Sequence, residues 1–141
     1  MNHGTVLYAE DEPTDIFFLQ RAFASAGIPH RLECVPDGEV AIEYLSGTGA
    51  FAGREENPLP CLILLDINMP GLYGLEVLQW TRQQPQLKEV PVLMLTSSSH
   101  PADMEKARYF GANDYLIKPS NPAQLVELAR KIHERWLSQP H

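Results

Sequence analysis

Two runs of apolar residues constrain the fold most strongly, because neither alternates with polar residues. They are CLILL at 61–65 and VPVLMLT at 90–96. A strand with one face in water would alternate, so near-continuous runs favour strands that are covered on both faces. The first run is far too short to cross a bilayer as a helix. These segments therefore predict a buried sheet in an α/β protein.

The rest of the chain alternates between short strand patterns and longer helical patterns. The expected strands are 5–9, 31–35, 61–66, 90–96 and 115–118, and the expected helices are 13–27, 37–47, 74–84, 101–112 and 123–137. Five strands alternating with five helices predict a parallel sheet between two layers of helices. With 141 residues the chain can bury one substantial core, so we expect a single domain over 1–141 with its core between 5 and 137.

Charge and cysteine content narrow the classes of partner. The chain has 11 Lys and Arg against 18 Asp and Glu, which gives a net charge of −7. This charge argues against binding to nucleic acid or to a membrane of anionic lipid, and suits a basic protein surface or a metal ion better. Cys34 and Cys61 form no CxxC pair, and no signal-like segment precedes the first strand, so we expect a cytoplasmic protein.

Polar residues stand at the carboxyl ends of four of the five expected strands. They are Glu10, Asp11 and Glu12 after the first strand, Asp66 after the third, Thr96 to Ser99 at the fourth, and Lys118 at the fifth. In a parallel sheet these ends meet at one edge, where ligands bind. Carboxylates brought together there would repel one another unless a cation lay among them. Oxygen ligands beside a phosphate favour Mg²⁺.

Taken together, these groups predict phosphoryl transfer to an aspartate. Asp66 would be the nucleophile that forms an acyl phosphate, while a metal ion, Lys118 and the Thr96 hydroxyl neutralise or bind its oxygens. Each residue alone also fits a simpler explanation, because acids and proline begin helices, aspartate forms turns, and a residue before proline is extended. Their occurrence at the ends of neighbouring strands favours the chemical interpretation.

Four stretches resemble the receiver domain of two-component response regulators. They are AEDEPTD, LILLDINMPGLYGLEVL, VPVLMLTSS and GANDYLIKP. The resemblance implies a flavodoxin-like (βα)5 sandwich with strand order 2-1-3-4-5, and phosphoryl transfer from a phosphohistidine of a sensor histidine kinase to Asp66. It also implies a phosphoacceptor signalling protein, which catalyses at most its own phosphorylation and dephosphorylation.

The same resemblance implies roles for the other site residues. Asp11 and Asp66 would bind Mg²⁺ directly, Glu10 would act mostly through metal-bound water, and Asn68 would offer its backbone carbonyl. Thr96 would be the switch hydroxyl, and Lys118 would pair with the phosphate and form a cis peptide bond with the following proline.

Tyr115 matches the aromatic residue that turns inward when Thr96 moves. By composition alone, Tyr115 would be an ordinary half-buried strand tyrosine.

Two features depart from the usual receiver pattern. Glu10 stands where many receivers have Asp, and the stretch 46–60 is longer than the usual connection between the second helix and the third strand. The long loop is either a tolerated insertion or a contact for a partner. Such a loop, together with Trp136, is similar to single-domain receivers that pair with phytochrome-type and related bacterial sensor kinases.

The end of the sequence predicts how a signal would leave the domain. After Trp136 only LSQPH follows, so we expect no effector domain and an output through an unknown downstream protein or onward phosphotransfer. Trp136 and Leu137 either extend an apolar stripe that supports a homodimer or cap the core, and the sequence leaves both open.

Rival functions lack residues that they require. A haloacid-dehalogenase-type phosphatase needs an acid two residues after the nucleophile, where this chain has Asn68. A flavodoxin needs a phosphate loop in place of EDEPTD, a P-loop nucleotidase needs GxxxxGK[ST], and the histidines show no zinc-ligand spacing. The remaining alternative is a protein-binding module that works without phosphorylation, against which the intact set of Asp66, Thr96 and Lys118 argues.

Overall fold

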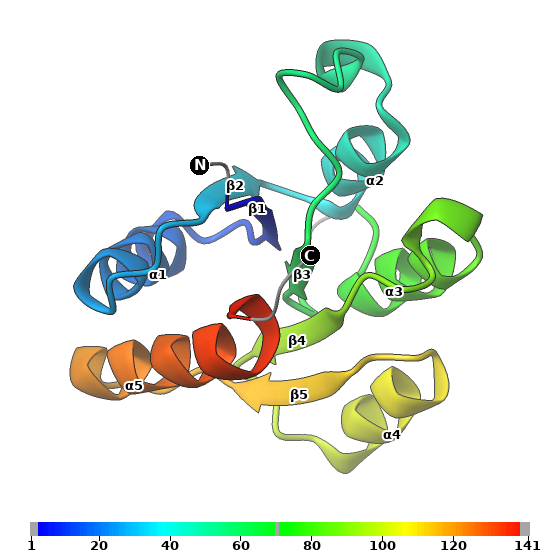
Figure 1. Ribbon diagram of the computed structural model, residues 1–141. Coiled ribbons are helices and arrows are strands. Elements are labelled where there is room, and N and C mark those ends of the chain that lie inside the picture. Colours follow the sequence, from blue (N-terminus) through cyan, green and yellow to red (C-terminus); the bar gives the residue numbers. More distant parts are fainter. Residues whose placement is uncertain (1–2, 70, 139–141) are drawn as a thin grey trace.

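A single parallel sheet forms the centre of the molecule (Figure 1). The computed structural model describes residues 3–69 and 71–138. The strands are β1 (Thr5–Ala9), β2 (Arg31–Val35), β3 (Leu62–Leu65), β4 (Val92–Thr96) and β5 (Asp114–Ile117), and they lie in the order β2-β1-β3-β4-β5. Every pairing is parallel. The predicted flavodoxin-like order is therefore confirmed.

Helices cover both faces of the sheet (Figure 1). They are α1 (Pro13–Ser25), α2 (Gly38–Ser46), α3 (Gly74–Arg82), α4 (Pro101–Tyr109) and α5 (Pro122–Ile132). One apolar core lies between the sheet and the pair α1 and α5, and a second lies between the sheet and α2, α3 and α4. β1, β3 and β4 are buried throughout, which explains their apolar sequences. No helix in the described part of the chain is long and apolar enough to cross a membrane.

The last predicted helix, 123–137, consists of an α-helix followed by a π-helical turn. α5 ends at Ile132, and a π-helical turn over His133–Leu137 continues it. Leu137 is buried, and Trp136 packs against the same core as α1 and α5. This packing supports the alternative in which these two residues cap the core. Residues 1–2, 70 and 139–141, which fall within the predicted domain, lie outside the described part.

The long loop at 46–60 is held against α2 by one arginine. The Arg54 guanidinium donates hydrogen bonds to the carbonyl oxygens of Tyr44 at 2.8 Å and Leu45 at 2.6 Å. Both carbonyls belong to the last turn of α2, where helix carbonyls lack their full set of partners, and the Tyr44 carbonyl accepts one further hydrogen bond within this turn, from the Gly47 N–H at 3.2 Å. The Tyr44 hydroxyl in turn donates to the Pro58 carbonyl at 2.9 Å. The loop is thus packed on the domain, and its role as a partner contact stays a prediction.

A close backbone approach positions the residue after β3. α3 begins at Gly74, whose N–H donates to the Ile67 carbonyl at 3.0 Å. A methyl group at Gly74 would lie 2.0 Å from the backbone oxygen of Asp66. Only glycine therefore allows the chain to fold back this tightly against the end of β3.

We predict that Gly74→Ala lowers the free energy of unfolding by about 1–3 kcal/mol, because the added methyl group would force the Asp66 backbone to move. Urea denaturation measures this change. Gly53→Ala is the matched control, since a methyl group at Gly53 meets nothing within 4 Å, and it should change stability by less than about 0.5 kcal/mol. Equal effects of the two substitutions would contradict the close-packing explanation.

Candidate functional site

The predicted site residues meet at the carboxyl edge of the sheet. Asp66 follows β3, Thr96 ends β4, and Lys118 follows β5. The strand hydrogen bonds continue one residue beyond the strands, since the Asp66 N–H donates to the Ala9 carbonyl at 3.1 Å and the Lys118 N–H donates to the Thr96 carbonyl at 2.8 Å. The sheet register thus places these side chains at the same edge as Glu10, which follows β1 directly.

The Lys118 ammonium is the centre of the site. Its Nζ pairs with Glu10 Oε1, with Asp15 Oδ2 at 2.8 Å and with Asp66 Oδ2 at 3.1 Å. Glu10 is 1% exposed and Asp66 is 6% exposed, so both carboxylates are nearly removed from water. Burying a charge in this way is costly unless a partner neutralises it. Lys118 is the cation that makes the arrangement stable.

The electrostatics of Glu10 and Lys118 reflect this crowding. Burial raises the pKa of Glu10 to about 7, and the Asp66 charge adds to the rise while Lys118 opposes it. For Lys118, burial lowers the pKa, but hydrogen bonds to Asp15 and Glu10 and the Asp66 charge outweigh it. The Lys118 pKa is therefore above its ordinary value, and the side chain stays an ammonium ion at neutral pH.

Three carboxylates form a candidate metal site. Glu10, Asp11 and Asp66 each offer one oxygen, and these oxygens lie within 4.8 Å of one another. Such a set of hard oxygen donors fits a divalent cation of the Mg²⁺ type. Asp11 is exposed, which leaves the site open to solvent on one side. The fourth predicted ligand, Asn68, donates its backbone N–H to Asp66 Oδ1 at 3.4 Å, and a role for its carbonyl stays a prediction.

Thr96 and Tyr115 are joined through Ser98. The Thr96 side chain is fully buried, and its Oγ1 accepts a hydrogen bond from the Ser98 N–H at 3.2 Å. The Tyr115 hydroxyl donates to the Ser98 carbonyl at 2.8 Å. The Ser98 hydroxyl also donates to Asp103 Oδ2, in the first turn of α4, at 2.7 Å. The switch roles of Thr96 and Tyr115 stay predictions, but the contacts through which they would act are present.

One expectation at this site is wrong. The described residues contain no cis peptide bond, so the bond between Lys118 and Pro119 is trans. Trans remains the preferred form before proline by about 0.5–1 kcal/mol. The Lys118 side chain nevertheless reaches the carboxylates.

Comparison with known proteins agrees with this geometry. The sequence model of the response regulator receiver domain matches residues 6–130. The chain belongs to this family. It is 35% identical over 132 residues to the response regulator Rcp1 of Synechocystis sp., which covers 94% of this chain and 88% of Rcp1.

Two solved receiver structures are similar over almost their whole length. The phosphorylated cyanobacterial phytochrome response regulator RcpA superposes with a TM-score of 0.90 at 35% identity, covering 99% of this chain and 97% of RcpA. The Mn²⁺-bound form of Rcp1 superposes with a TM-score of 0.86 at 33% identity, covering 98% of this chain and 97% of that chain.

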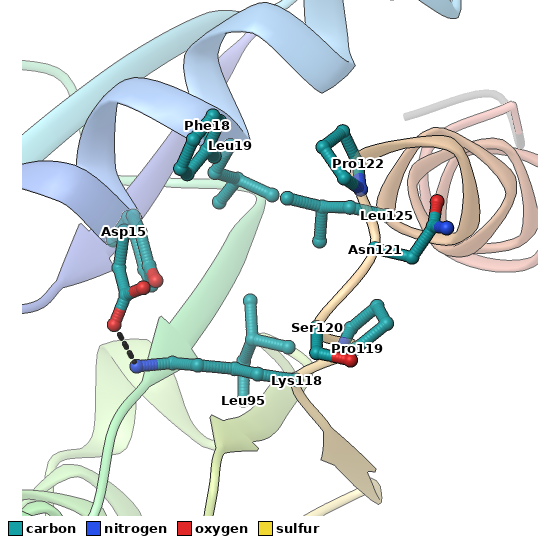
Figure 2. Close-up of a pocket in the computed structure, with 11 residues that line it drawn as sticks. Asp15, Phe18, Leu19, Leu95, Lys118, Pro119, Ser120, Asn121, Pro122 and Leu125 are labelled. Carbon is teal, nitrogen blue, oxygen red and sulfur yellow. Dashed lines mark hydrogen bonds and ion pairs between the residues drawn. The ribbon is translucent and has the colours of Figure 1, made fainter.

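Sequence reasoning missed two contributors to this receiver's site. Asp15, in the first turn of α1, pairs with Lys118 (Figure 2). Tyr8 lies within β1, and its hydroxyl donates to Glu10 Oε1 at 3.1 Å. Burial and the Glu10 charge raise the pKa of Tyr8, so it stays a neutral donor. The EDEPTD stretch places Asp15 in the first turn of α1, near the ends of the strands, but does not indicate which side chain Asp15 contacts.

We predict that a millimolar concentration of Mg²⁺ raises the thermal midpoint of this receiver, because the cation binds the folded carboxylate cluster and not the unfolded chain. The gain is about 1.4 kcal/mol when free Mg²⁺ is about ten times its Kd. Asp11→Asn should remove most of this gain, whereas Glu105→Gln on the exposed surface of α4 should keep it. Differential scanning calorimetry with and without Mg²⁺ measures the gain, and an undiminished gain in Asp11→Asn would contradict the assignment of the cluster.

Proposed function

We propose that this receiver accepts a phosphoryl group on Asp66 from a sensor histidine kinase, with Mg²⁺ as the cofactor. The observation that carries the proposal is the place of Asp66, whose carboxylate lies 3.1 Å from the Lys118 ammonium and within the cluster formed with Glu10 and Asp11. This place suits phosphoryl transfer, because Lys118 and a cation held by the cluster would neutralise the phosphoryl oxygens beside the attacking carboxylate, and the chemistry depends mainly on positioning and charge neutralisation.

The transfer step uses groups that are already in place. An oxygen of the Asp66 carboxylate attacks the phosphorus, the bond from phosphorus to the kinase histidine nitrogen breaks, and the electron pair leaves with that nitrogen. Lys118 neutralises a phosphoryl oxygen. Glu10, Asp11 and Asp66 would hold the Mg²⁺, with the Asn68 carbonyl as a further ligand. When bound, the ion supplies positive charge to the phosphoryl oxygens and to the attacking carboxylate.

The signal then leaves through the segment that follows β4. As the Thr96 hydroxyl turns toward the phosphoryl group, it gives up the hydrogen bond from the Ser98 N–H. Ser98 also contacts Tyr115 and Asp103, so its movement changes the position of Tyr115 and the first turn of α4. A new surface forms there for a downstream protein, or the phosphoryl group moves onward to another acceptor.

The kinase is proposed to be of the phytochrome type. The support is the likeness to RcpA, a phytochrome response regulator, over almost the full length of this chain. The packed loop at 46–60 is a candidate for a contact with that kinase. The free thiols of Cys34 and Cys61 and the kinase partner fit a cytoplasmic protein. The receiver is no enzyme for a separate substrate in this proposal, since it catalyses only its own phosphorylation and dephosphorylation.

We predict that acetyl phosphate and Mg²⁺ add the mass of one phosphoryl group to this protein, as a modification that is lost in base. Intact-protein mass spectrometry detects the gain. Asp66→Asn should abolish it, because the amide is not a nucleophile, and Glu105→Gln should leave it unchanged. No gain in the unsubstituted protein would contradict the proposal and favour a binding module that works without phosphorylation.

A further inference from the structure

Lys118 has one carboxylate partner that does not belong to the metal cluster. Asp15 Oδ2 lies 2.8 Å from Lys118 Nζ, and Figure 2 shows the two side chains reaching toward each other from α1 and from the end of β5. The cluster of converging carboxylate oxygens consists of Glu10, Asp11 and Asp66. Asp15 is thus in contact with the lysine and outside the group of oxygens that would hold a cation.

The number of N–H donors on Lys118 makes the position of Asp15 outside the cluster important. An ammonium has three N–H donors, and Glu10, Asp15 and Asp66 take all three. Glu10 and Asp66 belong to the cluster, so a bound cation would compete with Lys118 for the negative charge of both carboxylates. Phosphorylation would in addition convert one oxygen of Asp66 into the bridging oxygen of an acyl phosphate. During the reaction, Glu10 and Asp66 therefore also interact with the cation or the phosphoryl group. Of the three partners of Lys118, Asp15 alone interacts with neither.

The surroundings of the Lys118 stem leave it room to turn away from the site. The stem borders a pocket of about 60 Å³ whose apolar lining includes Leu19, Leu95 and Leu125 (Figure 2). No side chain of the described residues fills this space, so packing on this side leaves the Lys118 side chain room to move. A polar anchor has to hold the ammonium at the edge of the sheet instead.

We propose that Asp15 is a positioning residue, which keeps the Lys118 ammonium beside Asp66 while the cation and the phosphoryl group occupy the other carboxylates. The proposal rests on the proposed function, because it concerns the same transfer step. Asp15 suits this task because the first turn of α1 fixes its backbone, and its side chain is only partly exposed. A carboxylate at 2.8 Å from an ammonium forms a charge-assisted hydrogen bond, the stronger class of such bonds.

Phosphorylation by acetyl phosphate at saturating Mg²⁺ tests the proposal. Asp15→Ala should lower the rate at saturating acetyl phosphate about tenfold, which corresponds to the loss of one such hydrogen bond. Asp15→Asn keeps an acceptor oxygen in the same place and should recover part of the rate. The affinity for Mn²⁺, measured by electron paramagnetic resonance, should stay within about threefold in both variants, because Asp15 is not in the cluster.

Glu12→Gln is the matched control for charge. It removes a negative charge at the N-cap of the same helix, and Glu12 forms no ion pair with Lys118 among the described residues. Its rate should stay within about twofold of the unsubstituted protein. A rate in Asp15→Ala that is unchanged, increased or matched by Glu12→Gln would overturn the proposal, as would a parallel loss of Mn²⁺ affinity.

Two further results separate the possible failures. If Asp15→Ala does not fold, Asp15→Asn carries the test, and a rate equal to that of the unsubstituted protein then overturns the proposal. If the unsubstituted protein is not phosphorylated at all, the proposed function fails and the role of Asp15 fails with it. If the unsubstituted protein is phosphorylated and Asp15→Ala is phosphorylated at the same rate, the proposed role of Asp15 is wrong and the proposed function stands.

Discussion

The ion pairs of Lys118 are the interaction on which the site depends. Glu10 and Asp66 are almost fully buried, and carboxylates in that position would be too costly without a cation beside them. Lys118, directly after β5, supplies the cation, and the sheet order brings it to the same edge as the residues that follow β1 and β3. The charge balance of the site thus depends on the fold, which brings Lys118 to the buried carboxylates.

Backbone contacts make this arrangement precise. The strand hydrogen bonds extend to Asp66 and Lys118, and Gly74 lets α3 begin directly against the Asp66 carbonyl. The backbone of Asp66 is therefore fixed by main-chain contacts, while the groups around its carboxylate are side chains from other strand ends and from α1. This division fits a site in which one atom accepts a phosphoryl group and its neighbours change partners during the reaction.

Much of this could be predicted from the sequence, for a clear physical reason. Apolar strands that end in Asp66 and Thr96 reveal both the buried sheet and its reactive edge, because parallel strands carry their functional residues at one end. Asp15 and Tyr8 could not be assigned in this way. Their contacts depend on the orientation of α1 and on a side chain inside β1, and neither leaves a pattern along the chain. The peptide bond before Pro119 was predicted wrongly because sequence motifs do not show the small energy difference that decides it.

A crystal structure of the protein with Mg²⁺ and beryllofluoride, which imitates a phosphoryl group, tests most directly whether Asp66 is the phosphoacceptor and Lys118 its cation. We expect beryllium bonded to an oxygen of Asp66, one fluoride in contact with Lys118 Nζ, another with Thr96 Oγ1, and Mg²⁺ on the cluster of Glu10, Asp11 and Asp66. Beryllofluoride bound elsewhere, or a Lys118 that keeps its pairs with Glu10 and Asp66 while the fluorides lie apart from it, would contradict the claim that Asp66 is the phosphoacceptor and Lys118 its cation.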